Sequence, residues 1–449
     1  MKKIFQYIML AVVTIVMASC TSDIEETTAT TGKNNVQLVV GEFPAFGDSQ
    51  TRAIGTPDEG KTSWAEGDEL LLEIDNTSYG RHNATFTYNG KSWELTSGEL
   101  VYLEGDPAYI SHVYYAPNYK WSNTSLMLKK GKVAGTDELI EGKARITGNG
   151  ETITVSFAEA TRKYSRLRIA TLPNEQITVD TEYFTPAGSS DMEQNGNYTL
   201  TSDEKGNAYL YGTFENNSEV TVKYREAALT TYTFSQATES AKSYALDATV
   251  ISANSAEEIK SAIEQKVADG KTTIRLNLAP NAGTNEFMAI REAIKGAAPN
   301  DLGTIELTII GVETIPEETF YKMLQLKSVR MSDVKEIKKY AFKECQYLTV
   351  VEAPSLNKLY SGAFKKCDQL SKLTFGPINY ADERNWPIFE YITPNIDLIL
   401  SDYQKEMIET DSYLYTANND RDYAGSDEHN SKNFLGREFR SITCRYPVE

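Results

Sequence analysis

Side chains suited to acid–base or metal chemistry are scarce in this chain. Its 449 residues include three histidines, His82, His112 and His429, which lie in different segments without helical spacing to one another. Because histidine is the commonest metal ligand and titrates near neutral pH, this scarcity argues against a shared metal site. The chain also lacks a Gly-x-Ser-x-Gly elbow, a Walker loop and a His-Glu-x-x-His motif. We therefore predict a non-enzymatic protein with no catalytic residues, metal or cofactor, and a hydrolase with an unrecognised motif stays an alternative.

Thiol chemistry is indicated at one position, Cys20. Lys2 and Lys3 precede an apolar run from Ile8 to Met17. The run is too short to span a hydrocarbon core about 30 Å thick and is typical of a secretory signal peptide. It ends in Met17-Ala18-Ser19-Cys20, and small residues before a cysteine resemble the bacterial lipoprotein box. The resemblance implies a signal peptide at residues 1–19 and attachment to outer-membrane lipid through Cys20; an ordinary cleaved signal is the alternative.

The residues after Cys20 indicate a tether and a location. Residues 20–35 are rich in Thr and contain few large apolar side chains, which is typical of a flexible linker. The acidic cluster from Asp23 to Glu26 resembles the surface-export tag of lipoproteins in gut and oral Gram-negative bacteria. This resemblance implies a lipid-anchored protein of the cell outer membrane that faces outward. A solvated acidic linker is the other interpretation.

Composition narrows the class of partner. The chain carries 45 Lys and Arg against 63 Asp and Glu, a net charge of −18, and such an acidic surface repels a phosphate backbone. Nucleic acid is therefore excluded as an expected partner. With 40% hydrophobic and 24% charged residues, the composition is that of a globular protein with a core.

The N-terminal half has the pattern of short strands. Runs rich in β-branched and aromatic residues are separated by Gly, Pro, Asn and Asp turns, and we expect strands at 36–40, 70–74, 84–88, 152–157, 167–170 and 220–224. About 210 residues fit two β-sandwiches of about 100 residues each. We predict sandwiches at 36–135 and 136–250, with the break near Gly131 to Gly142.

Four segments in this half carry a family resemblance. Trp64 to Asp68 resembles the start of fimbrillin-like proteins, His112 to Pro117 resembles their Tyr-rich strand, and Tyr164 to Ile169 and Lys242 to Leu246 match the second half. The family forms tandem β-sandwiches in surface lipoproteins, some of which polymerise into pili. In those, an Arg protease removes the first strand, so the resemblance makes Arg52 a candidate processing site and pilus subunits candidate partners. A plain turn at Arg52 and structural roles for the aromatic residues are the alternatives.

The C-terminal half contains an internal repeat of 22 residues. Five apolar positions keep this step over three copies, which lies within the leucine-rich-repeat range: Val312, Val334, Leu356; Ile315, Ile337, Leu359; Phe320, Phe342, Phe364; Leu326, Leu348, Leu370; and Val329, Val351, Leu373. Ile337 to Cys345 and Leu359 to Cys367 resemble the BspA-type repeat. We assign residues 305–376 to these repeats, and we expect Cys345 and Cys367 to stack as small buried hydrophobes instead of binding metal.

The segments on either side of the repeats complete the predicted architecture. Ser255 and Glu258 form a capping box before an apolar periodicity that predicts a helix over 256–268, and a second helix is expected near 286–295. Residues 251–304 are thus an α/β cap, which a solenoid end requires. Residues 377–449 are predicted to supply closing strands and a polar loop.

A local charge inversion points to a binding surface. From Lys322 to Lys372 eleven basic and five acidic residues give a net charge of +6. The repeat step should gather five lysines into a ridge whose mutual repulsion an anionic glycan or an acidic protein could relieve: Lys338, Lys339, Lys343, Lys365 and Lys366. A solvated convex face is the alternative interpretation.

The function implied by these resemblances is adhesion. A stalk of two sandwiches would present the repeats outward to host or bacterial surface proteins or anionic glycans, and an accessory or tip role in a pilus is a further expectation. The alternative is a glycan-capture lipoprotein for nutrient uptake, which a flat aromatic platform in the sandwiches would favour.

Overall fold

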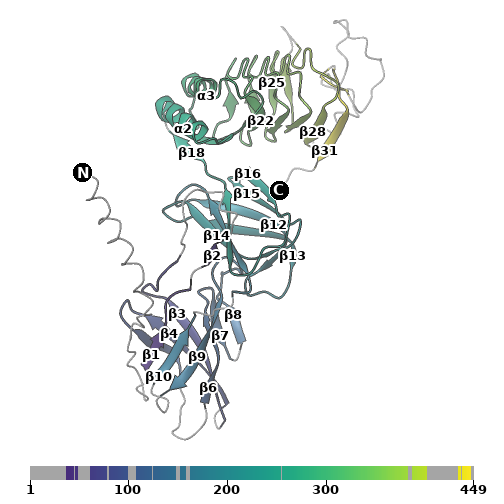
Figure 1. Cartoon of the computed structure of the whole chain (residues 1–449). Coiled ribbons are helices and arrows are strands. Elements are labelled where there is room, and N and C mark those ends of the chain that lie inside the picture. The colour runs from purple at the N-terminus through teal and green to yellow at the C-terminus, as the bar shows by residue number, and fades with distance from the viewer. Residues whose placement is uncertain are drawn as a thin grey trace, which may run out of the picture.

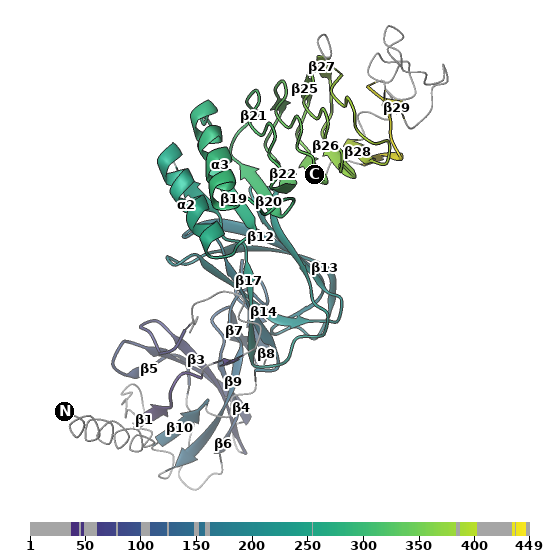
Figure 2. The ribbon, with the colours of Figure 1, turned by 45° about the horizontal axis from the view of Figure 1, so that its top comes forward.

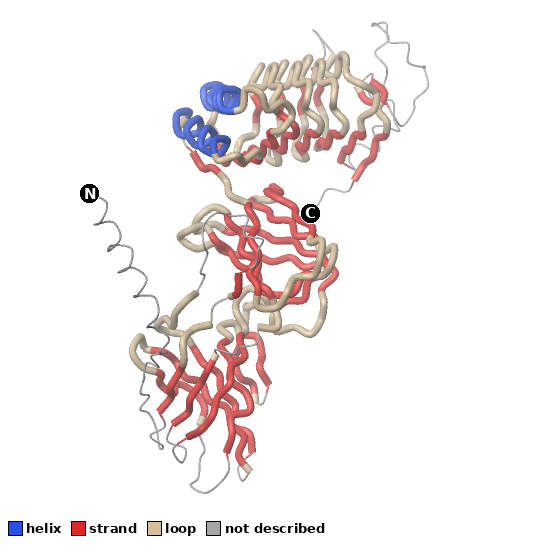
Figure 3. Tube along the Cα trace, in the orientation of Figure 1, coloured by secondary structure: helices blue, strands red, loops and turns tan. Residues whose placement is uncertain are grey.

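The chain is mainly β-structure, as its sequence predicts. This computed structural model describes residues 37–44, 46–48, 61–77, 80–99, 108–123, 125–147, 152–157, 162–253, 255–382, 387–401, 433–435 and 437–445. Within these ranges there are two helices, α2 (Ala256–Ala268) and α3 (Thr284–Ala297), and neither is long and apolar enough to cross a membrane. Strands and loops form the rest, and both helices lie at one end of the repeats (Figure 1, Figure 3).

The first β-domain is one sheet that curls around its own core. Every strand of the sheet contributes to a single buried cluster that includes Leu38, Phe86 and Trp93. Trp64 packs edge-on against Trp93 and donates its indole N–H to Gly41 O over 2.8 Å, so its role is structural. The strand order is β1 (Gln37–Val40), β10 (Thr152–Ser156), β9 (Ile140–Thr147), β6 (Ala108–Tyr115), β3 (Glu69–Asn76), β4 (Gly80–Tyr88) and β5 (Trp93–Gly98).

The predicted break between residues 135 and 136 is wrong. Strand β9 pairs with β6, with Tyr115 opposite Ile140, and β10 pairs with β9 and with β1. Ile153 and Val155 fill the first core. The Gly-rich stretch that suggested a linker follows a hairpin of β7 (Tyr119–Ser122) and β8 (Ser125–Leu128) and leads straight into β9. The first β-domain therefore continues to residue 157.

The second β-domain has a separate core around Val179, Phe214 and Val222. Its last strand, β2 (Gly47–Asp48), comes from the N-terminal segment and pairs in parallel with β17, so residues 36–135 do not all belong to one sheet. The order is β16 (Ala227–Thr233), β15 (Glu219–Tyr224), β12 (Gln176–Pro186), β14 (Asn207–Phe214), β11 (Ser165–Ala170), β17 (Lys242–Asp247) and β2, with β13 (Glu193–Thr201) paired to β12.

The repeat domain is a solenoid of parallel strands. Ser255 caps α2 by accepting the N–H of Glu258, as the capping box predicts. The main sheet runs through β18 (Ile251–Ala253), β19 (Thr273–Leu278), β20 (Ile305–Ile310), β22 (Leu326–Arg330), β24 (Val350–Ala353), β26 (Lys372–Phe375), β28 (Asp397–Ser401) and β31 (Ser441–Arg445) (Figure 2). The second sheet contains β21 (Thr314–Ile315), β23 (Glu336–Ile337), β25 (Lys358–Tyr360) and β27 (Tyr380–Asp382), and a hairpin of β29 (Asn433–Phe434) and β30 (Arg437–Glu438) lies near the end.

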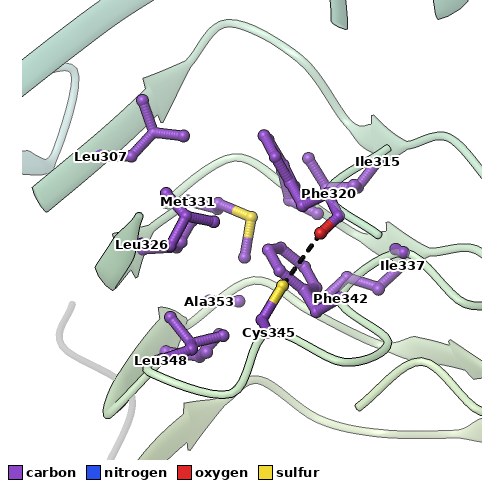
Figure 4. Close-up of a cluster of buried hydrophobic side chains, with 14 of the residues drawn as sticks. Leu307, Ile315, Phe320, Leu326, Met331, Ile337, Phe342, Cys345, Leu348 and Ala353 are labelled. Carbon is purple, nitrogen blue, oxygen red and sulfur yellow. Dashed lines mark hydrogen bonds between the residues drawn. The ribbon is translucent and has the colours of Figure 1, made fainter. Parts of the chain in front are cut away.

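The 22-residue step sets the packing of the solenoid core. The Phe342 ring stacks on Phe320 and on Phe364, with centroids 5.1 Å and 5.4 Å away. Cys345 and Cys367 are fully buried, as predicted, and their thiols donate to the carbonyl oxygens of Phe320 and Phe342 (Figure 4). Burial in this apolar core raises the pKa of Cys345 to about 12, so the thiol stays protonated.

The predicted end of the repeats at residue 376 is too early. The next phenylalanine of the stack, Phe389, follows Phe364 by 25 residues and lies 5.8 Å from it. Leu373 pairs with Leu398 across the same longer step, and β31 then pairs with β28. Three additional residues break the sequence register without breaking the sheet, which is why the fixed step loses the next coil.

Candidate binding surface

The predicted lysines lie in the turns that follow the second sheet of the solenoid. In each turn a phenylalanine points inward, and backbone hydrogen bonds link neighbouring coils, as from Phe342 N to Ala363 O (2.9 Å) and from Glu344 N to Lys365 O (2.8 Å). Equivalent positions therefore stack. One column contains Tyr321, Lys343, Lys365 and Glu390, and the adjacent column contains Lys322, Glu344, Lys366 and Tyr391.

Tyrosine rings separate the lysines in these columns. The Lys343 ammonium lies 5.0 Å from the centroid of Tyr321 and 4.7 Å from that of Tyr340, and Lys339 lies 4.8 Å from Tyr340 on the same turn. The Tyr340 ring rests on Gly362, where a Cβ atom would come within 2.5 Å of it. Cation–π contacts of this kind contribute about 0.5–1 kcal/mol each at exposed sites.

Two of the five predicted lysines have partners that remove them from a common ridge. Lys365 is buried and its ammonium lies 2.5 Å from Glu390 Oε2. Lys338 pairs with Glu336 and lies 4.4 Å from the ring centroid of Tyr360. Hydrogen bonds from Lys338 and Lys358 hold the pKa of Glu336 below its usual value. The expected repulsion among five free lysines is therefore wrong, because acidic and aromatic neighbours already relieve it.

What remains exposed is a mixed surface that we name the Tyr–Lys ladder. Neither Lys339 nor Lys366 forms an ion pair within the described part of the chain, and Tyr391 is 61% exposed. Ammonium groups form charge-assisted hydrogen bonds with sulfate or carboxylate oxygens, and the rings supply apolar contact area. The ladder consists of Tyr321, Lys322, Lys339, Tyr340, Lys343, Lys366 and Tyr391.

Charges on the main sheet of the solenoid are paired with one another. Glu352 contacts Arg330 at 2.9 Å and Lys372 at 3.6 Å. The side chains of Arg440 and Ser441 donate to Asp397 and lower its pKa to about 2. Because neighbouring strands neutralise each other here, the ladder is the better candidate for binding an anion.

The other predicted site residues lie elsewhere. Cys20, Arg52 and His429 are outside the described residues. His112 lies 3.4 Å from Glu141 Oε1 and stacks on Tyr114, apart from the solenoid. Within the described ranges no group of three or more His, Cys, Asp or Glu side chains is placed to hold a metal ion.

Sequence reasoning found the lysines of the ladder but missed its tyrosines. Tyr321 occupies the repeat position of Lys343 and Lys365, and Tyr340 occupies that of Gly362. Aligning every position of the repeat, including the polar ones, would have brought these rings beside the lysines.

Comparison with known proteins identifies the repeats. Residues 302–409 match the BspA type leucine rich repeat region, which confirms the predicted repeat family and extends it beyond residue 376. No curated protein matches the chain. A crystal structure of a Bacteroides fragilis protein, described as a candidate cell adhesion protein, aligns with 50% of this chain and 89% of its own at 10% identity, with a TM-score of 0.28 that is too low to support an inference. The C-terminal solenoid is thus a BspA-type leucine-rich-repeat region, whose match covers less than half of the chain.

Proposed function

We propose that this chain is a non-enzymatic, adhesion-type surface protein that binds surface molecules through its repeat domain. The observation that carries the proposal is the Tyr–Lys ladder, an exposed row of cations and rings on a BspA-type solenoid. The solenoid core beneath it is apolar and closely stacked, so the ladder is held in place by the coils and needs little ordering on binding.

The partner proposed is an anionic glycan or an acidic surface protein. Four lysines of the ladder surround one carboxylate, Glu344, which lies 3.4 Å from Lys322 and 3.9 Å from Lys343. The ladder is therefore cationic within an acidic chain of net charge −18. A sulfated polysaccharide offers closely spaced anions that match such a row.

Surface-bound heparin is a suitable probe of this proposal. Full-length protein with Lys339→Ser, Lys343→Ser and Lys366→Ser should lose at least about tenfold of its retention, because each change removes a cation of the ladder. The matched control, Lys327→Ser, Lys335→Ser and Lys372→Ser, removes the same charge from lysines that pair with acids elsewhere on the solenoid. Equal loss in both variants would reduce the interaction to net charge and contradict the proposal.

Lysines 338 and 365 are best left unchanged in this experiment. Replacing Lys365 would leave Glu390 buried without its partner, and replacing Lys338 would disturb the pair with Glu336. Loss of binding in such variants could follow from damage to the coils.

Anchoring to the outer membrane through Cys20 belongs to the same proposal and rests on the sequence before and after that residue. Cys20→Ala should release the protein from membranes or block its maturation, since no other acylation site is proposed. A variant that still labels with fatty acid and partitions into detergent would contradict lipidation. Digestion of intact cells with an added protease tests the outward orientation: an outward-facing protein is cut, and a protected one is not.

A second candidate function is that of a pilus subunit, consistent with the fimbrillin resemblance. Two edge strands precede Arg52: β1 buries Leu38 in the first core, and β2 pairs with β17 of the second sheet. Cleavage at Arg52 would free both strands and open an edge in each sheet, and edges of this kind accept a strand from another chain. Trypsin-like nicking followed by a ladder of oligomers on gels supports this candidate, and a persistent monomer contradicts it.

A further inference from the structure

A polar pocket of about 350 Å³ lies where the two β-domains meet. One wall is Thr136 and Asp137, in the loop that joins β8 to β9 of the first β-domain. The opposite wall is formed by the second β-domain, with residues from the end of β13 and from β14: Thr199, Leu200, Thr201, Tyr209 and Tyr211. Ligand pockets begin at about 300 Å³, so this one suits a small molecule or one unit of a polymer.

Both walls are held in place by contacts within the chain. Tyr211 N donates to Gly135 O over 2.7 Å and thereby joins the loop to β14. The Thr136 hydroxyl accepts from Asn118 Nδ2 at 2.9 Å and donates to Val133 O at 2.9 Å. Because these bonds fix the loop on both sides of Asp137, the pocket is preformed and a ligand would not need to order it.

Two polar groups at the pocket lack full hydrogen bonding. Tyr211 is 8% exposed, and none of the described residues hydrogen bonds its hydroxyl. The carboxylate of Asp137 accepts a single hydrogen bond, from Glu138 N at 2.8 Å, and burial raises the pKa of Asp137. A buried polar group without a partner costs free energy, so a ligand that pairs with both groups would recover it.

The chemistry of the lining selects a neutral ligand with many hydroxyl groups. No basic side chain lines the pocket, since nearby Arg162 pairs with Glu138 and Arg166 donates to Ser243. An anion would meet the charge of Asp137 without a cation to offset it. A calcium ion prefers six to eight oxygen ligands, and one carboxylate lines the pocket.

We propose that this pocket binds one sugar residue of a neutral glycan. Sugar hydroxyls would donate to Asp137 and accept from Tyr211, while Thr199 and Thr201 offer further hydroxyl partners at the rim. The rings of Tyr209 and Tyr211, 27° from parallel with centroids 6.3 Å apart, would contact the C–H face of the sugar. This site is separate from the ladder and gives the chain a second binding surface, which fits capture of glycans as well as adhesion.

Titration of the full-length protein with maltose, cellobiose, mannobiose, lactose and chitobiose, followed by saturation-transfer NMR and calorimetry, tests the proposal. We expect at least one disaccharide to bind, and Tyr211→Phe and Asp137→Asn each to weaken it about tenfold or more. Matched controls are Tyr232→Phe and Asp191→Asn, at exposed positions outside the pocket lining. If Tyr211→Phe does not fold, Thr199→Ala with Thr201→Ala, at exposed positions, serves as the second variant and should weaken binding at least threefold.

Three results would overturn this assignment. They are absence of binding to all five disaccharides, equal affinity in the wild type and the pocket variants, and equal weakening by the controls. The triple lysine variant of the ladder should keep wild-type affinity for the disaccharide, so failure of the pocket and failure of the ladder are distinguishable.

Discussion

The repeat domain and the two β-domains are both built from strands, yet they obtain their order from different distances along the chain. In the repeat domain Phe320, Phe342 and Phe364 stack through one local step. In the first β-domain, β1 pairs with β10 more than one hundred residues later, and β2 crosses to the second sheet. Local steps fix a register from neighbouring residues, whereas distant pairings depend on the closure of long loops.

The two regions also differ in what they bury. The solenoid core is apolar and includes two protonated thiols, while the junction of the β-domains contains the ion pair of Glu138 and Arg162 at 2.9 Å, with both side chains under 5% exposed. Apolar stacking tolerates no gap, and a buried ion pair tolerates no missing partner. Substitutions in the two regions should therefore fail in different ways.

The largest effect is expected from Phe342→Ala in the solenoid. The ring is fully buried between two others, so its removal should lower the free energy of unfolding by about 3–5 kcal/mol. Hydrogen exchange read by mass spectrometry should show faster opening of the coils at 320–375 and unchanged protection in the β-domains. Loss of protection spread evenly over the whole chain would contradict local packing of the solenoid.

Arg162→Ala tests the junction of the β-domains. It would leave Glu138 buried without its partner and should cost about 3 kcal/mol in the free energy of unfolding. Removing Lys335, whose pair with Glu313 on the solenoid is exposed, should cost under about 1 kcal/mol. Chemical denaturation of both variants gives the comparison, and similar losses would show that burial does not separate the two pairs.

Lys365→Met and Lys366→Met compare adjacent residues of the same coil. Lys365 is buried against Glu390, so its replacement should destabilise the protein by about 2 kcal/mol, whereas that of exposed Lys366 should change stability by less than about 0.5 kcal/mol. Thermal unfolding of both variants measures the difference. Equal stability would mean that all lysines of the ridge are solvated alike.

The smallest effect is a pH dependence at Asp137. Because burial raises its folded pKa above the unfolded value, the stability that its protonated form contributes is complete below the unfolded pKa and is lost as pH rises toward the folded pKa. Asp137→Asn, which cannot ionise, should therefore become more stable than the wild type as pH rises above about 4. Denaturation midpoints from pH 3 to pH 7 measure this, and a deficit of the variant that grows with pH would contradict it.

Sequence patterns predicted the solenoid more fully than the β-domains. The 22-residue step and the Ser255 capping box predicted the stacked core and α2 because both depend on neighbouring residues. The break at residue 135 was wrong because glycines after the β7–β8 hairpin resemble a linker, and pairing of β9 with β6 is not visible in local composition.

The candidate surface was predicted in part for a related reason. Its lysines follow the repeat step, but their partners do not: Tyr340 aligns with Gly362, and Glu390 follows Lys365 by 25 residues instead of 22. The pocket between the β-domains could not be predicted, since Asp137 and Tyr211 are brought together by the packing of two separate sheets.

The central claim is that the Tyr–Lys ladder binds an anionic surface molecule, and the affinity of the full-length protein for soluble heparin as salt rises tests it most directly. We expect binding at about 0.1 M salt, where the Debye length is about 10 Å, and loss of binding near 1 M, where it is about 3 Å. The variant lacking Lys339, Lys343 and Lys366 should bind weakly, with a shallower salt dependence, while the matched control keeps the wild-type curve. Absence of binding by the wild type at low salt, or identical curves for the wild type and the ladder variant, would contradict the claim.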